Sequence, residues 1–226
     1  MPAVMLPRFS VPENGFPFAN SWEPGTPVLS VPTPFGTLGI GDTSGGVCGG
    51  MVFAAIDFFL DERPVPQEAT PELVQYFCRR LLDSWALPFG VVKYYDWQRT
   101  PGHSRFWLGT RVQSGLTRLT ILEEWPRIRA EIDRGIPAPL GLVNVYSWSF
   151  SQMARNHQVL CYGYCERDDR LEWHVYDPNW PGQTVILSLN ISSPDDEWLI
   201  EHSLEGPHIR GLFLTEYRRP QIAYGA

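Results

Sequence analysis

Three side chains with nucleophilic atoms, Thr43, Ser44 and Cys48, lie within the glycine-rich stretch GDTSGGVCGG at residues 41–50. A serine nucleophile needs a histidine and an acid to activate it, and the chain has no histidine before His103. The G-x-S-x-G turn of serine hydrolases is absent, and no Gly-Lys-Ser/Thr follows the glycines, so a phosphate-binding loop is not indicated either. We therefore interpret Ser44 as a turn residue.

Cys48 opens the segment CGGMVFAAIDFFL, residues 48–60, in which apolar residues occur on nearly every side, as in a buried helix. A thiol at a helix N-terminus is favoured as the reactive thiolate by the helix dipole. Gly49 and Gly50 each disfavour a helix by about 1 kcal/mol relative to alanine, and we interpret them as making room for a substrate backbone. The alternative is a small buried apolar cysteine, an interpretation that suits Cys78.

A cysteine nucleophile needs a base, and the candidate lies in NHQVLCYGYCERDDRLEWHVYDPNWPG, where two strand-like runs flank a polar turn. A hairpin turn centred near Arg167 places His157 directly across from Asp177. The polar residues 167–170 centre slightly later, so the hairpin requires a bulge or an offset. Because opposed Cβ atoms lie about 5 Å apart, the pair can form an imidazole–carboxylate bond. A carboxylate on the apolar face of its strand needs such a partner.

Asn179 is the competing candidate for the group that orients the imidazole, and Trp180 beside it could shield the bond from water. The sequence DPNWPG around them is also typical of a turn that ends a strand. His174 lies on the opposite face of the strand from Asp177, and three other histidines lie in loops or polar connections. We interpret them as solvated surface residues: His103, His202 and His208.

The elements that must position these residues change in character along the chain. A helix is predicted from a cap at Thr70 to about Ser84, and another from about Trp125 to a stop at Gly135. Strand-like runs follow at 141–147, 157–165, 171–177, 183–189 and 211–217. Helices followed by an antiparallel sheet predict an α+β fold.

Residues 1–40 are rich in proline and are predicted to form an extended arm that is anchored by phenylalanines and Trp22 and could cover a cleft. Residues 41–226 are predicted to form one domain, with a helical lobe at about 41–135 and a sheet lobe at about 136–226. The aromatic segment 86–118 is either a rim or lid of a cleft or part of the core.

Composition excludes several functional classes. The 226 residues carry a formal charge of -7, which argues against nucleic acid as a partner. Four cysteines are too few for a disulfide scaffold, and Cys161 and Cys165, about 13 Å apart on a strand, do not suit one metal ion. We expect no metal or cofactor. The N-terminal residues lack the pattern of a signal peptide, and no apolar run spans a membrane, so we expect a soluble, cytoplasmic protein.

Three motifs together resemble those of the papain-like cysteine peptidases. They are a cysteine that opens a buried helix in GVCGGM, a histidine that opens a strand in NHQV and an acid that closes the next strand in VYDP. Within these, the chain is most similar to the family-39 peptidases, which process bacteriocin leaders, and to related bacterial proteins. The resemblance covers roughly residues 41–60 and 156–182. It implies a papain-like fold in which Cys48 is the nucleophile, His157 the general base and Asp177 the orienting group of a catalytic triad.

One position departs from that family. A glutamine about six residues before the cysteine helps to hold the oxyanion in such peptidases, and here the position is Asp42. A carboxylate does not donate unless it is protonated, and loss of one donor costs roughly 10²–10³ in rate. Backbone amides at Cys48, or the side chains of Thr43 and Ser44, could substitute. The sequence ANSW at residues 19–22 is similar to the asparagine motif of papain, but it precedes the cysteine and we treat it as coincidental.

The resemblance predicts a hydrolase, a thiol protease that cleaves a peptide or isopeptide bond of a peptide or protein substrate through an acyl-enzyme. Acyl transfer and side-chain deamidation use the same triad and remain alternatives. A catalytically silent papain-like binding module is the third.

Overall fold

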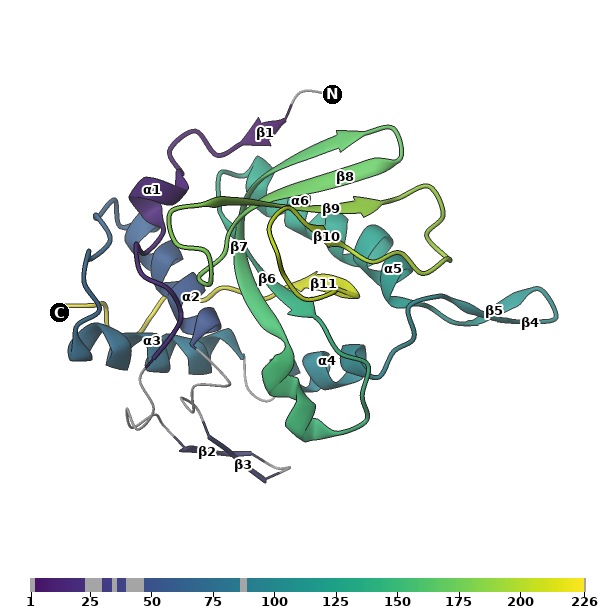
Figure 1. Ribbon diagram of the computed structural model, residues 1–226, viewed down its shortest axis with the longest axis horizontal. Helices are drawn as coiled ribbons and strands as arrows, with labels where there is room; N and C mark the ends of the chain where they lie inside the picture. Colours follow the sequence, from purple (N-terminus) through teal and green to yellow (C-terminus); the bar gives the residue numbers. More distant parts are fainter. Residues whose placement is uncertain (1–2, 23–29, 34–35, 40–46, 86–88, 226) are drawn as a thin grey trace.

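The computed structural model describes residues 3–22, 30–33, 36–39, 47–85 and 89–225, which form a mixed fold of helices and antiparallel sheet (Figure 1). This confirms the α+β class. None of the helices in these residues is long and apolar enough to cross a membrane. The helices are α1 Val11–Asn14, α2 Cys48–Leu60, α3 Pro71–Ser84, α4 Phe89–Gln98, α5 Leu116–Arg118 and α6 Trp125–Asp133, with a π-helical turn at Leu119–Glu124 and a 3-10 segment at Phe150–Arg155.

The main sheet has the strand order β10-β9-β8-β7-β6-β11, and β1 also pairs with β7. All of these pairs are antiparallel, and two separate hairpins join β2 to β3 and β4 to β5. The strands are β1 Val4–Met5, β2 Ser30–Thr33, β3 Gly36–Gly39, β4 Arg105–Trp107, β5 Thr110–Gln113, β6 Ala138–Val143, β7 His157–Arg167, β8 Arg170–Tyr176, β9 Thr184–Asn190, β10 Glu201–His202 and β11 Gly211–Leu214.

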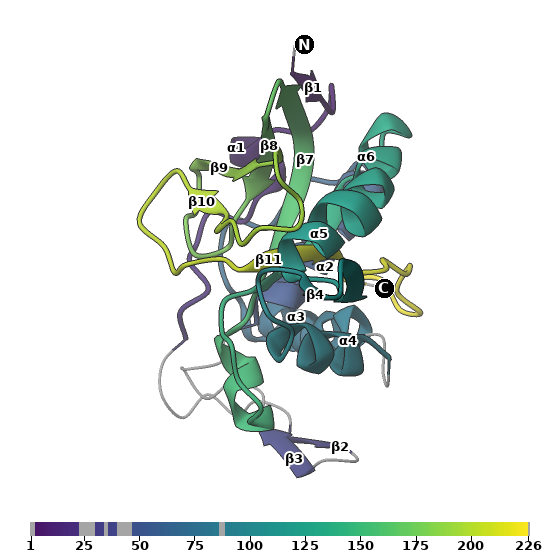
Figure 2. The ribbon, with the colours of Figure 1, turned by 90° about the vertical axis from the view of Figure 1, so that its right-hand side faces the viewer.

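The long strand β7 is the axis of the sheet. Its first half pairs with β6, from His157 opposite Leu142 onward, and its second half pairs with the short β1. The sheet is strongly curved, and Figure 2 shows α4, α5 and α6 on the side of β7 away from β9 and β10. The start of β7 therefore lies deep in the molecule, where α2 packs against it.

The sequence predicted the bounds of two helices correctly. In α2 every residue except Leu60 is buried, as its apolar pattern requires. In α3 the Thr70 side chain accepts a hydrogen bond from the Leu73 amide at 3.3 Å, which is the expected N-cap. The predicted helix at Trp125 is also present, but helical structure already begins at Leu116.

Gly49 and Gly50 permit a close contact rather than a substrate. A Cβ at Gly50 would lie 2.0 Å from the Phe77 carbonyl oxygen of α3, and one at Gly49 would lie 2.5 Å from Ser84 Oγ. The same Cβ at Gly49 would lie 2.8 Å from the Gln158 side chain on β7. Our interpretation of these glycines as room for a substrate backbone is therefore wrong, because neighbouring protein occupies that space.

The described part of the N-terminal arm is anchored by aromatic side chains, as predicted. Phe9 and Phe16 are buried, and Phe16 packs edge-on against Phe77 with ring centroids 4.8 Å apart. Trp22 lies 6.3 Å from the same ring. Hydrogen bonding adds to this, because the Phe16 amide donates to the Tyr176 hydroxyl at 3.3 Å.

The aromatic segment 86–118 is divided between core and surface. Helix α4 was not predicted, and its Tyr94 and Trp97 are buried against Phe213, with centroids 4.7 and 5.0 Å away. Phe106 and Trp107 instead lie on the exposed β4–β5 hairpin, which projects from the body in Figure 1. The core interpretation holds for α4, and no residue of the hairpin strands lines the cavity that contains Cys48.

A buried ion pair joins α2 to α3. Asp57 accepts hydrogen bonds from Arg80 Nε at 2.7 Å, Tyr76 at 2.8 Å and Tyr217 at 2.6 Å. The Arg80 side chain is 1% exposed and also donates to the Arg218 carbonyl at 2.7 Å. Burial raises the pKa of Asp57, and Arg80 with the two hydroxyls opposes that rise. The pair is hydrogen-bonded on both sides, so loss of one member leaves an unpaired buried charge.

We predict that Arg80→Met lowers the free energy of unfolding by about 3–5 kcal/mol, because Asp57 then remains buried without its cation. The matched control is Arg219→Met, which breaks the more exposed pair with Asp61 and is expected to cost about 1 kcal/mol or less. Urea unfolding followed by circular dichroism measures both. Equal losses for the two variants would contradict the structural role of the buried pair.

Candidate active site

His157 and Asp177 meet where β7 begins and β8 ends. His157 Nε2 lies 2.8 Å from Asp177 Oδ1. Leu160 pairs with Tyr176, and the register shifts between Cys161 and Gly163, which is the irregularity that the hairpin required. By extension of this register the two residues are offset by two positions rather than directly opposed. The sequence thus predicted the contact between His157 and Asp177. The two side chains meet diagonally across the strand pair, because their positions are offset by two residues.

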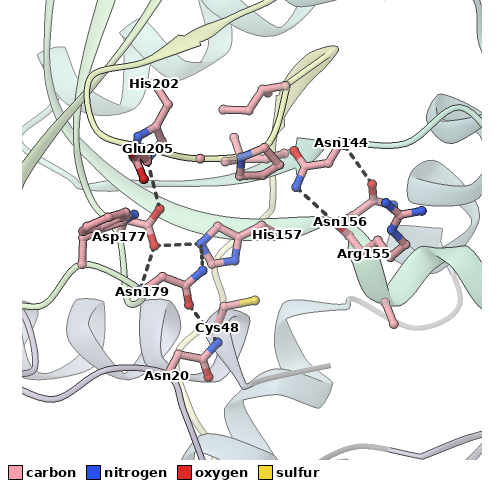
Figure 3. Close-up of a pocket in the computed structure, with 16 residues that line it drawn as sticks. Asn20, Cys48, Asn144, Arg155, Asn156, His157, Asp177, Asn179, His202 and Glu205 are labelled. Carbon is pink, nitrogen blue, oxygen red and sulfur yellow. Dashed lines mark hydrogen bonds and ion pairs between the residues drawn. The ribbon is translucent and has the colours of Figure 1, made fainter. Parts of the chain in front are cut away.

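Cys48 lies at the first position of α2 and shares a cavity with this pair (Figure 3). In the figure the second ring nitrogen of His157, Nδ1, is turned toward the cysteine. The three residues come from one helix and two strand ends that are far apart in the sequence. The cavity measures about 470 Å³, and its lining includes Asn20, Leu142, Asn144, Arg155, Asn156, Asn179, Trp180, His202, Glu205 and Ile209.

Electrostatics favour an ionised pair. Burial alone would lower the pKa of His157, but the Asp177 charge, the Cys48 sulfur and their hydrogen bonds raise it well above its usual value. Burial alone would raise the pKa of Asp177, but His157, His202 and the Asn179 amide hold it well below its usual range. An imidazolium beside the sulfur is the arrangement that stabilises a thiolate.

Asp177, rather than Asn179, is the group that orients the imidazole. The Asn179 side-chain nitrogen lies 3.4 Å from His157 Nε2, compared with 2.8 Å for the carboxylate oxygen. Asn179 contributes through its backbone, because its amide donates to Asp177 Oδ1 at 2.8 Å. The expected turn is therefore present and helps to fix the carboxylate. Trp180 lines the same cavity, and its ring lies 6.4 Å from that of His202.

His202 was wrongly interpreted as a solvated surface residue. Its side chain is 6% exposed, and its Nε2 lies 3.5 Å from Asp177 Oδ2, the oxygen that His157 does not use. His202 Nδ1 lies 3.1 Å from the Leu204 amide and 2.9 Å from the Leu204 carbonyl oxygen, so the backbone of Leu204 fixes the ring with Nε2 toward the carboxylate. His208 is exposed, and His103 is 56% exposed beside Glu197, so those two interpretations agree with the structure.

Asn20 also lines the cavity, although the sequence alone did not assign it to the site. Its Oδ1 accepts from the amide of Val47, the residue before Cys48, at 2.7 Å, and from Trp22 Nε1 at 3.2 Å. Its Nδ2 donates to Asn179 Oδ1 at 3.4 Å. The arm therefore supplies a side-chain amide between the cysteine helix and the loop after β8. Local sequence rules do not indicate this role, because the partners of Asn20 in the helix and the loop lie 27 and 159 positions away.

The residues considered for the oxyanion, Asp42, Thr43 and Ser44, lie outside the described residues. The N-terminal amides of α2 are described. The first intrahelical bond runs from the Met51 amide to the Val47 carbonyl at 2.9 Å. The amides of residues 48–50 therefore have no partner within the helix and form a local donor group at the sulfur.

The three other cysteines differ from Cys48 in their surroundings. The four cysteines are buried and form no disulfide, and Cys48 and Cys78 have the same exposure, 9%. Burial raises the pKa of the Cys161 thiol to about 12 and also raises that of Cys78. Cys161 and Cys165 lie on β7 among core residues. Only Cys48, among the described cysteines, lines the cavity that contains a histidine.

Comparison of the chain with protein-family models, with curated proteins and with solved structures finds no match. We therefore infer the chemistry of the site from the residues that form it. A thiol at a helix N-terminus, an imidazole and a buried carboxylate are the elements of nucleophilic catalysis by cysteine.

We predict that the ion pair stabilises the fold mainly between about pH 4 and 6.5. The contribution of His157, whose pKa is raised, is complete below about pH 6.5 and is lost as the pH rises through its folded pKa. The contribution of Asp177, whose pKa is lowered, is complete above about pH 4 and is lost as the pH falls toward its folded pKa.

Urea unfolding of the wild type and Asp177→Asn across this range measures the difference in unfolding free energy. The difference should be largest inside the window and shrink on either side. The exposed Asp169→Asn serves as the control and should show little difference at any pH. A pH-independent difference for Asp177→Asn would contradict the ion pair.

We predict that His202→Ala lowers the free energy of unfolding by about 1–3 kcal/mol, because it leaves one oxygen of a buried carboxylate without its donor. His208→Ala, in the same connection but exposed, should stay within about 0.5 kcal/mol of the wild type. His202→Gln, which retains a donor, should recover part of the loss. If the two alanine variants behave alike, His202 is not a partner of Asp177.

Proposed function

We propose that the protein is a thiol-dependent hydrolase with a papain-like catalytic arrangement, a cysteine peptidase or isopeptidase. The observation that carries this proposal is the convergence of Cys48, His157 and Asp177 in one cavity, with a 2.8 Å bond between the last two. The α+β architecture, with the cysteine on a buried helix that packs on the start of an antiparallel strand, supports the same assignment.

In the proposed mechanism the Cys48 sulfur, paired with the His157 imidazolium, attacks the carbonyl carbon of the substrate amide. The C–N bond then breaks, and His157 gives its proton to the leaving amine. A water molecule next loses a proton to His157 and attacks the thioester, which releases the acid and restores the thiol. Asp177 holds the ring so that Nδ1 faces the sulfur throughout, because Nε2 is bonded to its carboxylate.

The oxyanion is assigned to two kinds of donor at the start of α2. The amides of residues 48–50, which have no partner within the helix, lie at its N-terminus, where the helix dipole also favours negative charge. Asn20 fixes this end, since its Oδ1 holds the Val47 amide, and its Nδ2 is a side-chain donor in the same cavity. The proposal therefore does not depend on a glutamine before the cysteine.

A peptide substrate suits the polar lining of the cavity. Asn144 Oδ1 is buried and has no hydrogen-bond partner within the described residues, although the residue is fixed by its Nδ2 bond to the Arg155 carbonyl at 3.1 Å. Asn144 lines the cavity together with Cys48. An unpaired acceptor in this position favours a ligand with an N–H group, such as a peptide backbone.

We predict that iodoacetamide alkylates Cys48 at least about tenfold faster than Cys78 at pH 7, although the two thiols are equally exposed. His157→Ala should remove the difference, because the imidazolium that stabilises the thiolate is lost. Peptide mass spectrometry resolves the rate at each cysteine. Equal rates in the wild type would contradict the activated thiol and favour a silent binding module.

The reaction itself is tested with a mixture of synthetic peptides and Cys48→Ala as the control. Hydrolysis yields two shorter products with one added water, whereas deamidation preserves length and replaces an amide nitrogen with oxygen. Acyl transfer requires an added amine and joins it to the acyl product. Cleavage that is lost in Cys48→Ala and His157→Ala supports the hydrolase. A deamidated product or an amine adduct would contradict the hydrolase and identify the protein as a deamidase or an acyltransferase.

A further inference from the structure

A second cavity lies beside the active site, at the base of the β4–β5 hairpin. It measures about 530 Å³ and is lined by Asp96, Arg99, Arg105, Gln113, Tyr146 and Trp148, together with two small residues. We call this cavity the arginine–aromatic groove. It does not contain Cys48 or its partners.

The groove is locally basic in an acidic protein. Residues 99–113 contain three arginines and no acid, whereas the whole chain carries a formal charge of -7. Asp96, the acid in the lining, is already paired with Arg99 at 2.6 Å. Arg105 forms no ion pair within the part of the chain that the structure describes. The charge that remains for a ligand is therefore positive.

The aromatic walls are exposed and held rigidly. Tyr146 is 53% and Trp148 66% exposed, and the Arg99 guanidinium lies 5.5 Å from the centre of the Trp148 ring. The backbone beneath them is fixed by Gln98, which is fully buried and donates to the carbonyls of Ser147 and Ser149 at 3.0 and 2.7 Å. Exposed tryptophan and arginine on a preorganised backbone are typical of interaction surfaces.

One loop connects the groove to the active site. Asn144 lines the cavity that contains Cys48, and Tyr146 and Trp148 line the groove. Four residue steps separate Asn144 from Trp148, so the two cavities lie at most about 14 Å apart along this loop. Figure 1 shows this part of the chain, after β6, passing beside α4. About four or five extended residues of a substrate that follows the loop span the distance between the two cavities.

We propose that the arginine–aromatic groove binds an acidic, extended segment of the substrate polypeptide a few residues from the bond that Cys48 attacks. The link to cleavage rests on the proposed function. The binding of an acidic segment does not, because the residues of the groove are separate from Cys48, His157 and Asp177. A carboxylate of the segment pairs with Arg105, and its backbone or side chains pack on Trp148 and Tyr146. The groove thus selects the substrate, whereas the triad acts on it.

Binding is tested by fluorescence anisotropy with two labelled peptides of about eight residues, one of alternating glutamate and serine and one of glutamine and serine. The acidic peptide should bind at least about tenfold more tightly, and its affinity should fall with salt. Arg105→Glu and Trp148→Ala should each weaken it by about tenfold or more. The matched controls are the exposed Arg167→Glu and Trp107→Ala, which lie outside the groove and should change the affinity less than about twofold.

Equal affinity for the two peptides, or equal effects of the groove and control variants, would overturn the proposal. Tighter binding of single-stranded DNA than of the acidic peptide would overturn it as well, because nucleic acid would then be the occupant. Cys48→Ser, which leaves the groove intact, should bind the acidic peptide as the wild type does.

The link to catalysis is tested with the same two peptides, each joined through about five glycines to an acyloxymethyl ketone that reacts with thiols. The acidic peptide should label Cys48 at least about tenfold faster than the glutamine peptide, and Arg105→Glu should remove that advantage. Labelling at equal rates would overturn the placement of the groove next to the reacting bond. If Cys48 reacts with neither ketone while the acidic peptide still binds in the groove, the proposed hydrolase fails and the acidic binding site remains.

Discussion

The close contact of α2 with α3 and β7 is the constraint on which the site depends. It is possible only because Gly49 and Gly50 lack side chains, since a Cβ at either position would overlap the neighbouring element. The contact brings the N-terminus of a fully buried helix to the first residue of the central strand. The sulfur and the imidazole then lie in one cavity without any further adjustment, and the cost of two glycines in a helix is offset by packing.

A buried carboxylate is the second constraint, and the site satisfies it with three donors. Asp177 is 3% exposed and contacts His157, His202 and the Asn179 amide. Each donor comes from a different segment. Hydrogen bonds to the Asp177 carboxylate therefore connect the start of β7, the turn after β8 and the end of β10. An ionised group in this position is stable only while these partners are present. The same contacts that make the fold specific also set the orientation of the imidazole.

The sequence was most informative where local rules determine structure. The all-round apolar pattern and the Thr70 cap gave the bounds of α2 and α3, and strand alternation with a polar turn paired His157 with Asp177. It failed where contacts are long-range. His202 lies on a two-residue strand with no periodicity, and Asn20 lies in an arm without regular pattern, so neither could be placed by spacing. Helix α4 was missed because its aromatic residues do not follow a single helical face.

The position of Asn20 has a consequence for how the surroundings of Cys48 are assembled. The residue before the cysteine is held by an asparagine that lies 27 positions earlier, and that asparagine is held in turn by the loop after β8. The asparagine and that loop lie 159 positions apart in the chain, so only a long stretch of it contains these parts together. Cys48 therefore has this full set of neighbours only when the arm is docked against the loop after β8. The surroundings of the thiol are set by residues far from it in the sequence, so a change at position 20 or 179 alters them as directly as a change beside the cysteine.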